Sequence, residues 1–346
     1  MNNYLLKLSL LISLFVLVAT VDRFIRDRGH QDKPSESSFL NNPGIEDDRG
    51  SNAYFHSKAI LPDFDNPPTL KQSDIIYNTS RNLAPIVIEE YNTIFFHVAK
   101  AASSEWIRLF LKLSGSDLWC LKCVHGRQHE GLKYLSDYSV EEAQQMMTSP
   151  DWTRAIYTRH PKARLLSAFL DKSVHKFKAF ERDRCKKIGK RGGDYNECIE
   201  KHTDFSYFLH TVTTLMSENI HWRSIYSRVD EKWWPWINYV SNMENLSEDA
   251  EHFLRGIKSN IDGVSAWDRV GKTGWGEDEH DCNNLGSNAF LQVKDKRHKT
   301  NAEEKMRKYY TPELEAFVET HYADDLDNPY FKFSKVELFA KERNAQ

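Results

Sequence analysis

Residues 86–113 read IVIEEYNTIFFHVAKAASSEWIRLFLKL, and this stretch decides the predicted fold. It opens with two short runs rich in β-branched and aromatic residues, which predict buried strands. From Ser104 to Leu113 the apolar residues recur with the period of a helix, and Ser104 is the expected N-cap. A strand, a tight run of small residues and a helix in this order are typical of an α/β fold.

The turn between that strand and helix predicts an anion site. It contains Lys100, Ala101, Ala102, Ser103 and Ser104. The free N–H groups at the start of a helix attract anions, and the lysine and the serine hydroxyls add further donors. The turn lacks the GxxxxGK[ST] pattern of ATP- and GTP-hydrolysing proteins. Taken alone, it is equally explained by a solvated lysine in a surface turn.

A second strand-to-helix turn lies in residues 157–172, which read YTRHPKARLLSAFLDK. Arg159 ends a predicted strand over residues 153–159, and Ser167 lies about two turns into the helix that follows. A guanidinium and a hydroxyl so placed can bind one phosphate. Arg164 either shares this task or pairs with an acid. The alternative for this segment is an amphipathic helix with arginines on its surface.

Further helices are predicted over residues 205–215, 247–257 and 312–322, the last with Thr311 as N-cap and Pro312 at its first position. Strands followed by helices predict an α/β domain with a largely parallel sheet over residues 85–340. The net charge of −3 provides no basic field for nucleic acid.

The N-terminal sequence predicts delivery to the secretory pathway. Residues 4–21, YLLKLSLLISLFVLVATV, are apolar and just long enough for a transmembrane anchor, with residues 1–3 in the cytosol. A cleaved signal peptide is the alternative, and both place the rest of the chain in the lumen. Residues 22–84, rich in Asp, Asn, Ser and Pro, are interpreted as a stem.

Five cysteines fit an oxidising compartment. Cys185 and Cys198 flank a basic loop and are natural partners. Cys120 and Cys123 form a CxxC pair, which suits a redox pair, half a zinc site or, more simply, structural disulfides that involve Cys282. The sequons at Asn78 and Asn245 are compatible with glycosylation in the lumen.

Together the two turns resemble the motifs that bind 3′-phosphoadenosine 5′-phosphosulfate (PAPS) in the Golgi carbohydrate sulfotransferases, the group that includes the chondroitin and dermatan 4-O-sulfotransferases. The resemblance covers residues 92–331. The matching positions are Val98, Lys100, Trp106, Arg159, Pro161, Arg164, Leu165, Ser167 and Ala168. Three departures stand out: Ala99 replaces a proline, His160 replaces an acid whose ion pair is then lost, and no CxxC pair follows His221-Trp222.

The resemblance implies a P-loop-like parallel sheet flanked by helices, a single-pass type II Golgi membrane protein, and transfer of a sulfuryl group from PAPS to a glycan hydroxyl without a metal. Lys100 would neutralise the leaving oxygen, and the loop would bind the 5′-phosphate through Ser103 and Ser104. Arg159 and Ser167 would bind the 3′-phosphate.

The resemblance also suggests a catalytic base and a loop that closes over the nucleotide. His125 is the first candidate for the base, His129 the second and His221 the third. Arg297 and Lys299, in a basic run near the C-terminus, are expected to contact the nucleotide.

Two other functions compete with this interpretation. A type II glycosyltransferase would need an acidic DxD motif, but Asp63-Phe-Asp65 lies in the predicted stem and Asp325-Leu-Asp327 lies beyond the last helix. A glycan-binding membrane protein without catalytic activity would stack sugars on a tryptophan-rich stretch. That stretch contains Trp233, Trp234 and Trp236.

Overall fold

The computed structural model describes residues 54–55, 62–77, 84–120, 125, 128–175, 182–270, 301–331, 333–334 and 336–339, all within the compact unit Ser51–Gln346. Among these residues no helix is both long enough and apolar enough to cross a membrane. Several predictions fall outside the described residues: the anchor over residues 4–21 and the roles of Asn78, Cys123, Cys282, Arg297 and Lys299.

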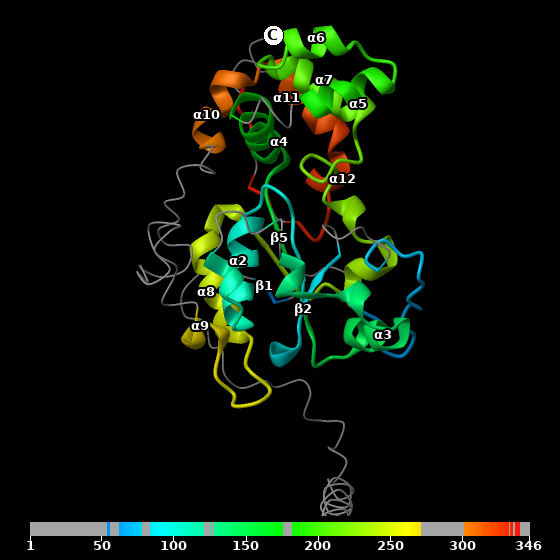
Figure 1. The fold of residues 1–346 in the computed structure, drawn as a ribbon, viewed down its shortest axis with the longest axis vertical. Coiled ribbons are helices and arrows are strands. Elements are labelled where there is room, and N and C mark those ends of the chain that lie inside the picture. Colours follow the sequence, from blue (N-terminus) through cyan, green and yellow to red (C-terminus); the bar gives the residue numbers. More distant parts are fainter. Residues whose placement is uncertain are drawn as a thin grey trace, which may run out of the picture. The chain divides into compact units, whose positions relative to one another are not determined.

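A six-stranded sheet forms the centre of this unit, in the order β1-β6-β5-β3-β2-β4 (Figure 1). β6, β5 and β3 run parallel at its centre, whereas β1 and β2 are antiparallel to these strands and β4 is antiparallel to β2. The strands are β1 (Tyr54–Phe55), β2 (Ile86–Ile88), β3 (Thr93–Phe96), β4 (Lys133–Tyr134), β5 (Thr153–Thr158) and β6 (Tyr239–Asn242).

The prediction of a largely parallel sheet is therefore right for its centre and wrong for its edges. β2 and β3 are separated only by the short 3-10 helix η1 (Glu89–Tyr91) and Asn92, whose φ of 43° closes the turn. A parallel connection needs a crossover of about a dozen residues, so a linker this short forces the two strands to be antiparallel.

Helices α2 (Ser103–Leu113), α8 (Leu246–Gly256) and α9 (Ala266–Arg269) cover one face of the sheet (Figure 1). Trp106 and Phe110 of α2 pack there against Phe95 of β3, with ring centroids 4.9 and 4.8 Å apart. The contact is aromatic and fully buried, so this face carries much of the hydrophobic core.

The opposite face is covered by α3 (Val140–Thr148) and the 3-10 helix η9 (Glu231–Trp236). Trp233, Trp234 and Trp236 are buried in this second core, with at most 2% of each residue exposed. The tryptophans that a glycan-stacking function would require at the surface therefore contribute to packing instead.

Part of the segment predicted as a stem belongs to the folded unit. Leu70 and Ile76 are buried in the second core, and the N–H of Ile75 donates to Asp230 Oδ2 at 2.9 Å. β1 also pairs with β6. The folded unit thus begins before Pro85. A few buried apolar side chains are enough to attach this otherwise polar, proline-rich segment to the sheet.

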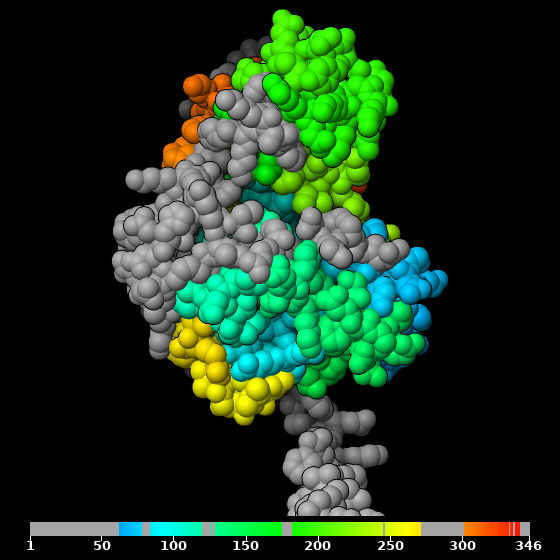
Figure 2. Space-filling view, viewed as in Figure 1, coloured from blue at the N-terminus to red at the C-terminus, as the bar shows by residue number. Residues whose placement is uncertain are grey.

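A third core is built mainly from helices: α4 (Pro161–Phe169), α5 (Arg182–Lys190), α6 (Tyr195–Glu200), α7 (Phe205–Leu215), α10 (Ala302–Tyr309) and α11 (Pro312–His321). The short α12 (Ala323–Leu326) follows α11. The predicted disulfide between Cys185 and Cys198 is confirmed, and it joins α5 to α6. Figure 2 shows the surface of α5–α7 in green; both cysteines lie beneath it, fully buried.

The helices predicted over residues 205–215, 247–257 and 312–322 are confirmed as α7, α8 and α11, with boundaries that differ by one residue at most. Thr311 caps α11 by accepting from the N–H of Leu314, and Pro312 occupies the first helical position.

Candidate active site

The turn between β3 and α2 has an unusual backbone. Lys100 and Ala102 both adopt left-handed conformations, with φ of 70° and 55°. Such angles cost about 1–2 kcal/mol for a residue other than glycine and are found mainly at functional sites. α2 begins at Ser103, directly after Ala102, so the prediction that Ser104 caps the helix is wrong. The first-turn N–H groups of α2 lie at this loop, as an anion site requires.

Lys100 is buried against an acidic partner. Its ammonium lies 3.1 Å from Asp171 Oδ2, and only 11% of its side chain is exposed. Burial lowers the pKa of Lys100 to about 8, an effect that the Asp171 carboxylate opposes. Lys172 Nζ lies 3.2 Å from the same carboxylate oxygen. Two ammonium groups therefore share one buried carboxylate beside the loop.

Arg159 follows the end of β5 and connects the two predicted turns. Its Nη1 donates to the backbone carbonyl of Lys100 at 2.9 Å. Its Nε and Nη2 donate to Glu303 Oε1 of α10, at 2.9 and 2.6 Å. This hydrogen bond joins the two predicted strand-to-helix turns directly, although 59 residues separate the donor from the acceptor.

Arg164 supports the shape of the loop. It is fully buried in α4; its Nε donates to the carbonyl of Ala99 and its Nη2 to the carbonyl of Ile220, both at 3.1 Å. Among the described residues its Nη1 is buried and has no hydrogen-bond partner. Arg164 thus holds the loop through backbone carbonyls, and a contact with the cofactor stays a prediction.

Ser167 lies on the face of α4 that meets the loop. Arg164, Ser167 and Asp171 follow one another at intervals of three and four residues, which places them on one side of a helix. The first contacts Ala99 and the last contacts Lys100, so the buried Ser167 lies between two residues that touch the loop.

The histidines differ in their distance from this loop. His125 Nε2 lies 2.8 Å from the hydroxyl of Ser104, so the structure brings the first candidate base to the site. His129 packs its ring against Tyr134 of the edge strand β4, with centroids 4.8 Å apart. The role of His129 as a base stays a prediction.

His221 lies near enough to the two lysines for their charges to act on its ring. Burial, followed by the positive charges of Lys172 and Lys100, holds the pKa of His221 well below its usual range, so the ring is neutral. Its Nδ1 lies 2.8 Å from the side-chain oxygen of Asn219. That oxygen can only accept, so Nδ1 carries the proton and Nε2 is the basic nitrogen.

Comparison with known proteins decides the family of this chain. A model of the sulfotransferase family matches residues 85–334, which include both turns. The chain belongs to the sulfotransferase family. The resemblance to the carbohydrate sulfotransferases is thereby supported, whereas the 4-O-specific subgroup stays a prediction.

Curated relatives of this sulfotransferase are carbohydrate sulfotransferases. Carbohydrate sulfotransferase 9 of Homo sapiens is 30% identical over 200 residues, which cover 54% of this chain and 43% of the relative. Carbohydrate sulfotransferase 11 of Rattus norvegicus is 28% identical over 186 residues, 49% of this chain and 51% of the relative. The chain thus spans about half the length of the curated relatives it matches. No solved structure matches it significantly.

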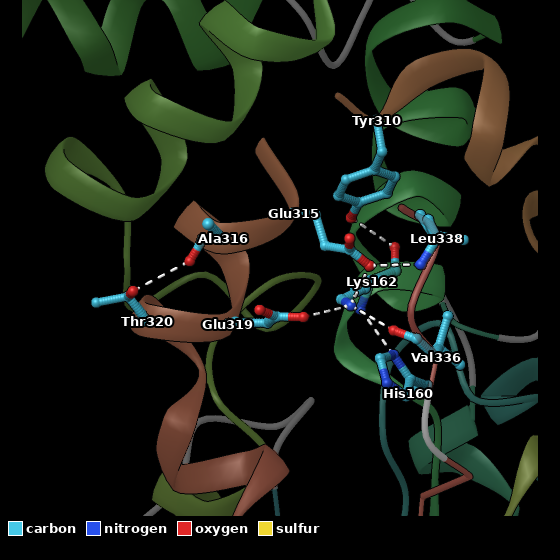
Figure 3. A network of polar contacts seen from close by, with 9 residues as sticks. All are labelled: His160, Lys162, Tyr310, Glu315, Ala316, Glu319, Thr320, Val336 and Leu338. Atoms are coloured by element: carbon cyan, nitrogen blue, oxygen red, sulfur yellow. Dashed lines mark hydrogen bonds and ion pairs between the residues drawn. The ribbon is translucent and has the colours of Figure 1, made fainter. Parts of the chain in front are cut away.

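His160, one of the departures from the sulfotransferase pattern, has a visible function. Its Nδ1 accepts from the N–H of Lys162 at 3.2 Å, so the imidazole caps α4 as an acidic side chain would. Lys162 pairs with the buried Glu315 at 2.6 Å and with the partly exposed Glu319 at 2.8 Å (Figure 3).

The acidic motif of the glycosyltransferase alternative is used for folding. Asp325 is fully buried and accepts from the backbone N–H groups of Ile225 and Tyr226 and from the hydroxyl of Ser224. A carboxylate whose oxygens are engaged by these donors stabilises a turn of the chain. Asp63 accepts in the same way from the side chain of Asn66, at the surface.

Three charged residues of the site escaped the sequence analysis: Asp171, Lys172 and Glu303. The helical spacing from Arg164 through Ser167 contained a signal for Asp171. No sequence pattern indicated Glu303. It lies 144 residues beyond Arg159 in the sequence, and only the folding of the chain brings the two side chains together.

Proposed function

We propose that this chain transfers a sulfuryl group from PAPS to a hydroxyl group of a glycan. The observation that carries the proposal is the contact between Arg159 and the carbonyl of Lys100, which joins a phosphosulfate-type loop to a second phosphate-type turn. Membership of the sulfotransferase family and the names of the relatives support the donor and the glycan acceptor.

In the proposed reaction the acceptor oxygen attacks sulfur in line with the bridging oxygen of PAPS. A new sulfur–oxygen bond forms, the bond from sulfur to the bridging oxygen breaks, and the electron pair leaves with the 5′-phosphate. Lys100 would stabilise the charge that develops on the leaving oxygen. Ser103, Ser104 and the first-turn N–H groups of α2 would hold the 5′-phosphate.

We assign the 3′-phosphate to Arg159 and Ser167. A bidentate guanidinium is the preferred partner of a phosphate, and a buried hydroxyl on the adjoining helix adds a second donor. Glu303 accepts from two nitrogens of this guanidinium. The 3′-phosphate would therefore replace one anion by another.

The hydroxyl proton of the acceptor needs a base, and we assign it to His125, whose ring contacts Ser104. His221 is the second candidate, because the charges of Lys172 and Lys100 help to keep its ring neutral and its Nε2 is the basic nitrogen. Loss of activity on replacing one of these histidines by Gln, with PAPS affinity retained, would distinguish the two.

We further propose a Golgi membrane protein with its catalytic domain in the lumen, anchored by residues 4–21. The buried disulfide between Cys185 and Cys198 supports an oxidising compartment.

The test is an assay of the full chain in detergent with radiolabelled PAPS and a panel of glycan acceptors, with and without EDTA. We expect transfer of label that EDTA does not reduce. Transfer from a nucleotide sugar that EDTA abolishes would favour a glycosyltransferase. Glycan binding without transfer from either donor would favour the non-catalytic alternative.

A further inference from the structure

The segment that follows α4 provides an acidic group that the proposed chemistry has not used. This segment, η6 (Leu170–His175), is a π-helical turn that continues α4. Wide turns of this kind are rare and occur frequently at functional sites. Asp171 lies at its start and is 4% exposed. A buried carboxylate is costly unless its charge is paired, so its partners indicate its purpose.

Two of those partners are lysines beside the anion loop. Lys100 and Lys172 approach the same oxygen, Oδ2, at 3.1 and 3.2 Å. The carboxylate thus has two cationic partners for its one negative charge. With two, it stays paired even when one of them turns away. Lys100 is the one that can turn to a bound anion, because it belongs to the loop itself.

We propose that Asp171 is a positioning residue, which fixes the Lys100 ammonium beside the loop in the donor-free protein and passes it to the bridging oxygen when the sulfonate donor binds. Lys172 remains on the carboxylate and prevents an uncompensated buried charge. This inference rests on the proposed function, since it gives Lys100 the role of stabilising the leaving oxygen.

The electrostatics of the cluster predict opposite effects for the two neighbours of Lys100. The carboxylate of Asp171 raises the pKa of Lys100, whereas Lys172 and Arg159 lower it, and His221 faces the same group as a neutral ring. Without Asp171 the pKa of Lys100 falls below about 8, so its ammonium is lost at a lower pH. Without Lys172 the pKa rises.

The experiment compares Asp171→Asn and Lys172→Met in the full chain. Competitive acetylation of the donor-free protein across a pH series, followed by mass spectrometry of the peptide that contains Lys100, gives the titration midpoint of this lysine. We expect the midpoint to fall by about one to three pH units in Asp171→Asn and to rise in Lys172→Met. The alkaline limb of kcat/KM for PAPS should move in the same two directions.

Asp183→Asn is the matched control, because it removes an aspartate from an exposed pair with Lys187, at 2.8 Å on α5. It should leave the midpoint of Lys100 unchanged. A general loss of structure would not move that midpoint in opposite directions in two variants of adjacent residues. Lys172→Met also keeps the test valid if Asp171→Asn does not fold.

An unchanged midpoint in Asp171→Asn, or shifts in the same direction in both variants, would overturn the proposal while sulfuryl transfer by the unmodified chain continued. Opposite shifts in a protein that transfers no sulfuryl group would instead reject the proposed function, and with it the catalytic purpose of this ion pair. The two failures are therefore distinguishable.

Discussion

Single residues connect the two turns of this site, and Arg159 contributes most to that connection. Its guanidinium is divided between the carbonyl of Lys100 and the carboxylate of Glu303. A cation held by a carboxylate from a distant helix is already oriented, so an incoming phosphate need only displace that carboxylate. Binding at this position therefore depends on a competition between two anions.

Arg159→Ala should remove the ability of the protein to distinguish nucleotides with a 3′-phosphate from those without one. Adenosine 3′,5′-bisphosphate should bind the unmodified chain more tightly than adenosine 5′-monophosphate, by about ten- to a hundredfold, the value of a charge-assisted contact. The variant should bind the two nucleotides almost equally. Isothermal titration measures both affinities. Equal binding by the unmodified chain would contradict the sulfotransferase assignment itself.

Glu303→Gln should have the opposite effect on the same nucleotide. The carboxylate is half exposed, so its competition with phosphate is weak, and its removal should tighten binding of the 3′,5′-bisphosphate about two- to fivefold. Glu304→Gln is the control, because Glu304 bonds to Asn301 and not to Arg159. If both variants bound alike in titration, competition at Arg159 would be excluded.

Lys100→Ala should lower kcat by about a hundred- to a thousandfold, the usual cost of losing a group that stabilises developing charge. The fold should remain, because Lys172 still pairs with Asp171. Steady-state kinetics and thermal unfolding together check this. A fall in the unfolding temperature that accounted for the lost activity would indicate a structural lysine.

Among the elements, α4 links the site to the helical core. It begins at Pro161, and its cap is the imidazole of His160. Around that cap Lys162 is surrounded by Glu315, Glu319 and the carbonyl of Val336 (Figure 3). The first turn of α4 is thus fixed by residues from the last quarter of the chain.

The cap makes the stability of this region depend on pH. Burial and the charge of Lys162 lower the pKa of His160 from its usual 6.5 to about 4. Between these values the unfolded chain binds the extra proton and the folded chain does not, so stability is lost as the pH falls from about 6.5 to 4. The loss is at most about 3 kcal/mol.

His160→Asn should flatten this part of the pH profile, because asparagine caps a helix without titrating. Chemical unfolding of both proteins across the same pH series measures the difference, which cancels the contribution of the other acidic groups. A profile identical to that of the unmodified chain would show that His160 has the same pKa in the folded and the unfolded chain.

For the whole molecule, the sequence predicted what depends on neighbours along the chain. The β3–α2 and β5–α4 segments were predicted because strand, turn and helix follow one another there, and the Cys185–Cys198 pair because the two residues flank one loop. Glu303 was not predicted, since only the folded chain brings α10 to Arg159. The antiparallel edges and the buried Leu70 depend in the same way on packing that no local pattern encodes.

The two turns belong to different cores, and this arrangement predicts how the donor affects the whole unit. α2 packs in the core on one face of the sheet, whereas α4 packs in the helical core. The 5′-phosphate is assigned to the first and the 3′-phosphate to the second. A nucleotide that carries both phosphates would therefore bind at two helices that pack in different cores.

Hydrogen exchange should show this coupling directly. Adenosine 3′,5′-bisphosphate should slow amide exchange in the first turns of both α2 and α4, because ligand binding stabilises the segments that contact it against local opening. Adenosine 5′-monophosphate, at a concentration that gives equal occupancy, should slow exchange in α2 alone. In Arg159→Ala the bisphosphate should give the pattern of the monophosphate. If both nucleotides protected α4 equally, that protection would not depend on the 3′-phosphate. The 3′-phosphate would then bind somewhere other than α4.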